Sequence, residues 1–164
     1  MNKQEIIDEI SKTKEYLANL EKMLKECESK RWKPEPNEEY YYVNQVSATS
    51  RAVNDEFDID AARCRTYNCF KTEEEAKQEA EKILVRRQLE DIARRLNKGQ
   101  EINWSDDNQI KYCIRFDFPL DMISICARLH QKLQGSVYCL SDKFKDVAIQ
   151  EIGEERLKKY LRGE

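Results

Sequence analysis

Residues 72–99, TEEEAKQEAEKILVRRQLEDIARRLNKG, form a long segment with helical periodicity. Thr72 and Glu75 have the spacing of a capping box, in which each side chain accepts a hydrogen bond from the other residue's backbone N–H. The acidic first turn suits the positive end of a helix dipole, and Gly99 is a natural terminator. The segment therefore predicts a helix from Glu73 to Asn97.

The apolar residues of this helix change face part-way along it. At about 100° per residue, two groups lie on nearly opposite sides: Ala76, Ala80, Ile83 and Leu84 on one, and Val85, Leu89, Ile92 and Leu96 on the other. Because one sheet cannot cover both sides, we expect the first half to pack on the preceding strands. The second half would then pack on the C-terminal lobe or on a partner subunit.

Strand-like segments lie on both sides of the helix. Residues 40–46 (YYYVNQV) are aromatic and β-branched and predict a strand, followed by a shorter one near residues 50–53 and an acidic loop at 55–60. Residues 111–118 and 123–128 alternate around a turn at 119–121 and predict a half-buried hairpin, with Tyr112, Ile114, Phe116 and Phe118 on one face.

The C-terminal segment predicts a short strand at 137–139 and a final helix. Ser141 and Asp142 are expected to cap this helix, and Gly153 to interrupt it. The two halves of the chain have the same order of strand, hairpin, short Cys-ending strand and capped helix. We interpret this as a duplicated β-β-(β)-α unit.

Residues 3–30 predict a helix with a heptad seam. The seam positions, spaced alternately by three and four residues, are Ile10, Thr13, Leu17, Leu20, Leu24 and Cys27. Pro34 and Pro36 then prevent the helix from continuing. We expect a dimerisation arm, with packing of the helix onto its own domain as the alternative.

Together these elements predict an α+β protein: a coiled-coil-like N-terminal helix and two small antiparallel hairpin–helix lobes. The predicted boundaries are 1–31 for the helix, 32–99 for the first lobe with its long helix, and 100–164 for the second lobe.

Composition narrows the function classes. The 164 residues carry a net charge of −3, with 37% charged residues. Generic nucleic-acid binding requires a basic surface, so we do not expect it here. The chain has no apolar run of the roughly 20 residues that a membrane helix needs, and no signal peptide, which predicts a cytoplasmic protein.

Catalytic and metal-binding patterns are weak. The six cysteines (Cys27, Cys64, Cys69, Cys113, Cys126 and Cys139) contain no Cys-x-x-Cys pair, so we expect small core side chains rather than a metal site or disulfides. The single histidine, His130, reads as an exposed loop residue. The acid pairs Asp58/Asp60 and Asp106/Asp107 read as solvated turn residues. We therefore predict no enzyme, no metal and no cofactor.

A mixture of aromatic and arginine residues is the strongest binding pattern. Aromatic faces stack on nucleobases, and Arg forks bind phosphate. The candidates for a nucleotide-like ligand are Trp32, Tyr40, Tyr42, Arg51, Arg63, Arg65, Tyr67, Trp104, Arg115 and Arg128. In a strand, Arg63 and Arg65 would share one face. The alternative is that many of these side chains are core.

The chain also resembles a family of small phage and prophage proteins of Firmicutes. The resemblance rests on Trp32-Lys33-Pro34, residues 39–43 (EYYYV), residues 68–76 (NCFKTEEEA) and residues 151–159 (EIGEERLKK). It covers nearly the whole chain, but the motifs are structural and transfer no catalytic residue.

This resemblance implies a counter-defence role in a bacterial host cell. The first expectation is an oligomeric protein that sequesters a nucleotide-derived immune signal. The alternative is an inhibitor that binds a host nuclease such as a CRISPR effector, with acidic residues 55–60 and 73–75 mimicking nucleic acid. A third reading is a weak enzyme that uses Cys and His130.

Overall fold

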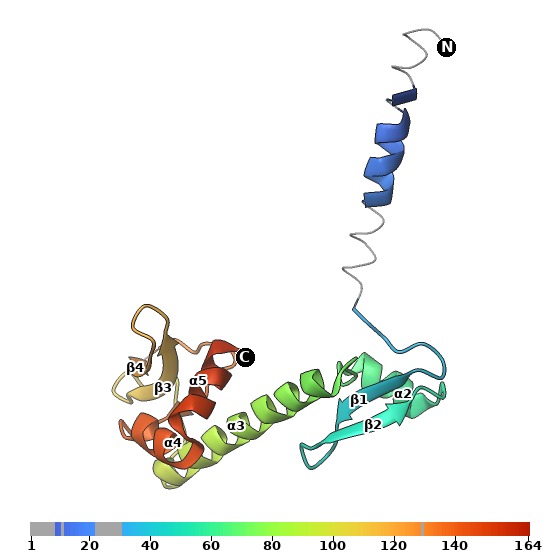
Figure 1. The fold of residues 1–164 in the computed structure, drawn as a ribbon. Coiled ribbons are helices and arrows are strands. Elements are labelled where there is room, and N and C mark those ends of the chain that lie inside the picture. The colour runs from blue at the N-terminus through green and yellow to red at the C-terminus, as the bar shows by residue number, and fades with distance from the viewer. Residues whose placement is uncertain (1–8, 11, 22–30, 129) are drawn as a thin grey trace.

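The computed structural model describes residues 9–10, 12–21, 31–128 and 130–164. Their elements are mixed helices and small antiparallel sheets, which confirms the α+β class. In chain order they are β1 (Glu39–Val43), β2 (Thr49–Val53), α2 (Asp58–Arg65), α3 (Glu73–Asn97), β3 (Lys111–Asp117), β4 (Met122–Arg128), β5 (Tyr138–Cys139), α4 (Phe144–Ile152) and α5 (Glu154–Arg162). The two sheets lie near opposite ends of α3 (Figure 1).

The N-terminal helix is described only in part. Residues 9–10 and 12–21 are helical, and all of them are exposed. Among the seam positions, Ile10, Leu17 and Leu20 expose 50%, 52% and 43% of their surface. Leu24 and Cys27 lie outside the described residues. Pairing of this helix with another copy stays a prediction.

Helix α3 has the bounds and the cap that its sequence predicts. The Thr72 hydroxyl accepts a hydrogen bond from the Glu75 N–H at 3.2 Å, and the Glu75 carboxylate accepts from the Thr72 N–H at 3.1 Å. The left-handed C-cap falls on Lys98, one residue before Gly99. This reciprocal pairing satisfies two N–H groups that the first helical turn would leave without partners.

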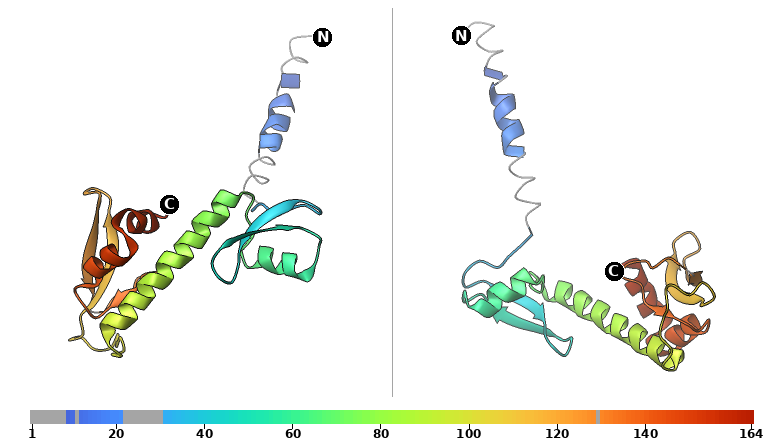
Figure 2. Two further views of the ribbon diagram at one scale, coloured as in Figure 1. Left: turned by 60° about the horizontal axis from the view of Figure 1, so that its bottom comes forward. Right: turned by 180° about the vertical axis from the view of Figure 1, so that it is seen from behind.

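The change of face along α3 is confirmed for its buried residues, but Leu84, which was expected on the covered face of the first half, is 36% exposed. Ala76 and Ala80 are buried in the first half, which contacts β1 and β2. Val85, Leu89 and Ile92 belong to the core that α3 shares with the second lobe. One helix therefore packs against both lobes, which lie near its opposite ends in both turned views (Figure 2).

The first lobe contains the antiparallel β1–β2 hairpin, and β1 also forms a bridge from Tyr41 to Phe70. The predicted strand 40–46 is too long, because Asn44 turns the chain after Val43. Its side-chain oxygen accepts hydrogen bonds from the N–H groups of Val46 and Ala48, and Ser47 takes a left-handed φ of 59°. This Asn-based turn removes residues 44–46 from the ladder.

The acidic loop predicted at 55–60 is wrong for its second half, because α2 begins at Asp58. Asp58 and Asp60 occupy the first turn of α2, where carboxylates are favoured by the helix dipole. Asp60 is 4% exposed, so it is a buried helical residue and not a solvated turn acid.

The second lobe contains the predicted hairpin and a third strand. The strand order is β4–β3–β5, and Ile114 pairs with Ile125. Ile114, Ile123, Phe144, Ile152 and Leu157 are buried together with the second half of α3. Phe118, which was expected on the inner face, is 68% exposed because β3 ends at Asp117 and Phe118 begins the turn.

The C-terminal helices differ from the prediction at their start. Helix α4 begins at Phe144 with Lys143 as N-cap and no side-chain cap, so Ser141 and Asp142 do not cap it directly. The Ser141 hydroxyl instead accepts from the Lys143 N–H at 3.3 Å in the preceding turn. Gly153 separates α4 from α5 with a φ of 92°, as predicted.

Candidate functional site

Three predicted ligand residues are joined in a network inside the first lobe. The Tyr40 hydroxyl donates to Asp60 Oδ1 at 2.5 Å and accepts from Arg63 Nη1 at 2.8 Å. The Arg63 guanidinium also lies 3.7 Å from the centre of the Tyr42 ring. Tyr40 is fully buried. These side chains hold α2 on β1, and their polar groups already have partners within the network.

The predicted strand geometry for Arg63 and Arg65 is wrong. Both residues lie on α2, and only Arg63 turns toward β1. Arg65 is exposed and lines a separate groove of about 540 Å³ with Lys33, Asn54 and Glu56. Helix formation by residues 58–65 separates the two side chains by about 200° around the helix axis.

The remaining sequence candidates are dispersed. Arg51 forms an exposed ion pair with Glu39 at 3.4 Å. In the second lobe, Arg115 donates to Ser124, and Trp104 packs edge-on against Tyr138 at 4.9 Å between ring centres. Arg128 lies on β4 of that lobe. The ten candidates therefore do not form one pocket.

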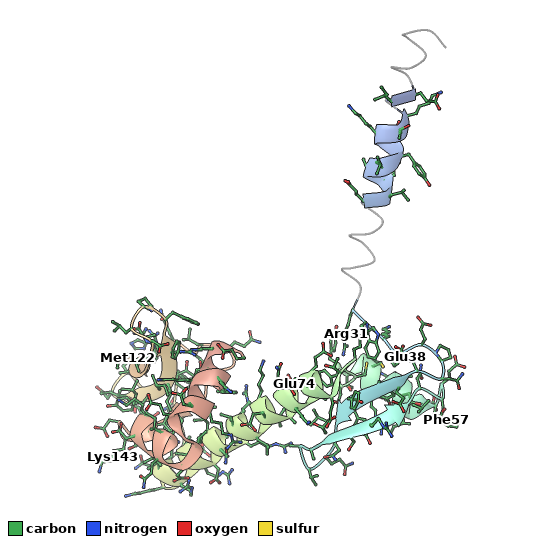
Figure 3. All side chains as sticks on the ribbon, viewed as in Figure 1. Arg31, Glu38, Phe57, Glu74, Met122 and Lys143 are labelled. Atoms are coloured by element: carbon green, nitrogen blue, oxygen red, sulfur yellow. The ribbon has the colours of Figure 1, made fainter. Side chains whose placement is uncertain are left out.

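Trp32 and Tyr67 do come together, in a cavity of about 440 Å³ that we call the Trp32 groove. Its lining is Arg31, Trp32, Tyr67, Cys69, Phe70, Lys71, Glu75, Gln78, Glu79 and Lys82. It lies where the chain enters the first lobe, at the position of the labelled Arg31 (Figure 3). Residues 31–32, the residues just before α3 and the first turns of α3 build it.

The groove combines aromatic surface with positive charge. The Arg31 guanidinium lies 4.1 Å from the centre of the Tyr67 ring and donates to the Cys64 carbonyl at 3.0 Å. Lys82 donates to the Gly163 carbonyl at 2.6 Å. The Glu75 carboxylate is held by the N–H groups of Lys71 and Thr72. The groove thus contains three cationic side chains, Arg31, Lys71 and Lys82. Its two acidic side chains are Glu75, which is bonded to the backbone, and Glu79.

Sequence reasoning missed several groove residues: Arg31, Phe70, Lys71 and Lys82. Phe70 and Lys71 directly precede the capping box, so the sequence could have predicted their position at the start of α3. Lys82 is the tenth residue of α3. The helical period of 3.6 residues places it on the same face of α3 as Glu75 and Gln78, and this period was the only sequence signal for its position.

A second, larger cleft lies between the two lobes. It measures about 650 Å³ and is lined by the β1–β2 turn (residues 47–49), by the first half of α3 and by α5. Cationic and acidic side chains alternate along it, and Arg156 of α5 pairs with Glu81 of α3. The lining of this cleft therefore carries both signs of charge.

Three of the described thiols, those of Cys69, Cys113 and Cys139, are poor nucleophiles in the reduced chain. Burial raises the pKa of Cys69 and of Cys113 to about 12, with a neighbouring thiol adding to the shift, and burial also raises the pKa of Cys139. Such thiols are protonated at neutral pH, whereas a nucleophilic cysteine requires the thiolate. His130 lies 3.1 Å from Asp107, and both side chains are largely exposed.

The described ranges contain no cluster of three or more His, Cys, Asp or Glu side chains suited to a metal ion. Within the same ranges, no helix has the length and apolar character needed to cross a membrane. No family model, curated protein or solved structure matches the chain.

Proposed function

We propose that this chain is a non-enzymatic binding protein that sequesters a nucleotide-derived ligand in the Trp32 groove. The observation that carries the proposal is the gathering of Trp32, Tyr67 and Phe70 beside Arg31, Lys71 and Lys82 in one cavity of about 440 Å³. The volume falls within the range of roughly 300–1,000 Å³ that small-molecule sites occupy.

The chemistry of the groove suits such a ligand in two ways. Aromatic side chains offer faces on which a nucleobase stacks, at about 1–3 kcal/mol per base. Cationic side chains compensate phosphate charge, and a guanidinium such as that of Arg31 donates hydrogen bonds to phosphate oxygens. Arg31 already lies over the Tyr67 ring, so one cation is held beside an aromatic face before any ligand arrives.

The biological context is proposed from the resemblance to phage and prophage proteins. Accessory proteins of that kind act against host defence, and several defence systems signal through cyclic or ADP-ribose-derived nucleotides. Sequestration of such a signal in the host cytoplasm would require binding alone, with no turnover.

The decisive experiment measures thermal unfolding with cyclic di- and trinucleotides and ADP-ribose derivatives. Binding to the native state raises apparent stability by about 2.7 kcal/mol at a hundredfold excess over the Kd. We expect one ligand to raise the Tm and to be recovered unchanged after denaturation. Tyr67→Ala should abolish the shift without unfolding the protein, because Tyr67 is 73% exposed.

The matched control is Phe57→Ala, which removes an exposed aromatic ring of the same lobe that does not line the groove. It should leave the ligand shift intact. No Tm shift for any ligand, or equal losses in the two variants, would refute sequestration in this groove. Turnover of the ligand would refute the non-enzymatic role.

A second candidate function is direct inhibition of a host nuclease, supported by the cleft between the lobes. Charge mimicry is the weaker route to it, because Asp60 is buried, Glu75 caps α3 and Glu73 pairs with Lys77 at 2.9 Å. In a nuclease inhibition assay, Leu84→Glu in the cleft should reduce inhibition under this alternative, and Tyr67→Ala should not.

We further propose that the two lobes are duplicates and that the N-terminal helix forms a homo-oligomer. In the first lobe β1 pairs with β2 and with Phe70, and α3 follows. In the second lobe β3 pairs with β4 and with β5, and α4 follows. In both lobes the helix begins within five residues of the last paired residue. The exposed seam of the N-terminal helix supports pairing with a second copy.

A further inference from the structure

Two cysteines of the second lobe face each other across the β3–β4 hairpin. Cys113 and Cys126 occupy directly opposite positions of the antiparallel ladder. Their Sγ atoms are 2.7 Å apart. Side chains at opposite positions have Cβ atoms about 4.5–5.5 Å apart, close to the spacing that a disulfide bridges.

A disulfide bond measures about 2.05 Å, so the two sulfurs need to approach by less than about 1 Å. The strands on either side already hold the correct register, from Lys111–Arg128 to Asp117–Met122. Closing the bond therefore requires side-chain rotation and no change of strand pairing.

From this geometry we propose that Cys113 and Cys126 are a modification site, a dithiol that closes to a cross-strand disulfide by exchange with a low-molecular-weight disulfide. The site lies in the second lobe, outside the Trp32 groove, and does not depend on the proposed function. Oxidised glutathione is a suitable co-reactant class, because it carries the two-electron oxidising equivalent.

The order of the two steps follows from accessibility. Cys113 is 1% exposed, whereas Cys126 is half-buried. The Cys126 thiolate therefore attacks one sulfur of the added disulfide, and the other sulfur leaves as a thiolate. Cys113 then loses its proton to solvent and attacks Cys126 Sγ, which releases the second thiolate. In sum, two protein thiols are oxidised and one disulfide is reduced to two thiols.

Arg128 assists the second step. It lies two residues from Cys126, on the same face of β4, opposite Lys111. Burial and the neighbouring Cys126 raise the pKa of Cys113 to about 12, and the positive charge of Arg128 opposes this rise. The Arg128 guanidinium therefore favours the Cys113 thiolate at the moment of attack.

The test treats the full chain with oxidised glutathione, quenches with acid, alkylates the remaining thiols under denaturing conditions and maps each cysteine by peptide mass spectrometry. We expect a linked Cys113–Cys126 peptide to accumulate, while Cys139 of the same lobe stays reduced. Cys139 is the internal control because it is fully buried and its thiol contacts Asn97.

Two variants separate the steps. In Cys113→Ser, Cys126 should stop as the mixed disulfide with glutathione, and in Cys126→Ser, Cys113 should remain a thiol. If both cysteines of the unmodified chain are recovered as thiols after the same exposure, or if they link to other cysteines, the proposal is overturned. This mapping of the unmodified chain decides the matter even where a variant fails to fold.

Discussion

The hydroxyl of Tyr40 donates a 2.5 Å hydrogen bond to the carboxylate of Asp60, and both side chains are almost completely buried. Arg63 completes the network by donating to the same hydroxyl and by lying 3.4 Å from the same carboxylate. A buried carboxylate is tolerated only when such partners compensate its charge. The attachment of α2 to the β1–β2 hairpin therefore depends on Tyr40, the second residue of β1.

Replacing Tyr40 with Phe should destabilise the protein by about 1–3 kcal/mol, because it removes the shorter hydrogen bond to the buried Asp60 oxygen, which keeps only the 3.4 Å contact with Arg63. Urea denaturation measures this change in the free energy of unfolding. The matched control, Tyr42→Phe, keeps the ring on which Arg63 stacks and should have a smaller effect. Equal effects of the two variants would contradict a specific role for the Tyr40 hydroxyl.

The same hydrogen bond predicts a dependence of stability on alkaline pH. Burial, followed by the bond to Asp60, raises the pKa of Tyr40 from 10.0 to about 12. A raised pKa favours the folded state below the unfolded value, and this contribution is lost as the pH rises from about 10 to about 12. The stability gap between the native chain and Tyr40→Phe should therefore narrow over this range. A gap that stays constant would show that Tyr40 keeps its ordinary pKa in the folded state, and a gap that widens would show that this pKa is lowered.

The capping box of α3 should contribute a measurable part of its stability. Thr72→Ala removes the acceptor for the Glu75 N–H and should cost about 1 kcal/mol of unfolding free energy. Lys77→Ala, one turn further on and exposed, removes only a surface ion pair with Glu73 and should cost less than about 0.5 kcal/mol. Chemical denaturation monitored by circular dichroism compares the two variants directly.

The N-terminal helix should set the oligomeric state. Leu17→Glu together with Leu20→Glu places charges on the proposed seam and should convert an oligomer to a monomer, as seen by light scattering after size exclusion. Glu15→Lys, on the face of the helix opposite the seam, is the control and should leave the mass unchanged. A monomeric native chain, or an oligomer that survives both seam substitutions, would exclude pairing through this helix.

Local signals were sufficient for the helix and the hairpins of this chain. Thr72 and Glu75 specify the start of α3 because a capping box needs only residues three positions apart. The alternation through residues 111–118 and 123–128 predicted the β3–β4 pair, since period-two patterning identifies the buried face of a strand. The spacing of the apolar residues likewise predicted that α3 is buried on different faces in its two halves.

The site depended on contacts between residues far apart in the chain. Nothing local to Asp60 shows that it is buried, because its environment is made by Tyr40, twenty positions earlier. The sequence offered three residues with the chemistry of a ligand site: Tyr40, Tyr42 and Arg63. Once α2 packs on β1, these side chains contact one another instead. Trp32 and Tyr67 have the same composition and line a groove, because residues 31–32 and 67–71 meet against α3. Periodicity and capping in the sequence determined α3 and the β3–β4 hairpin. Helix α2 and the packing of the elements, which decides which of these side chains stay exposed, followed only from the tertiary structure.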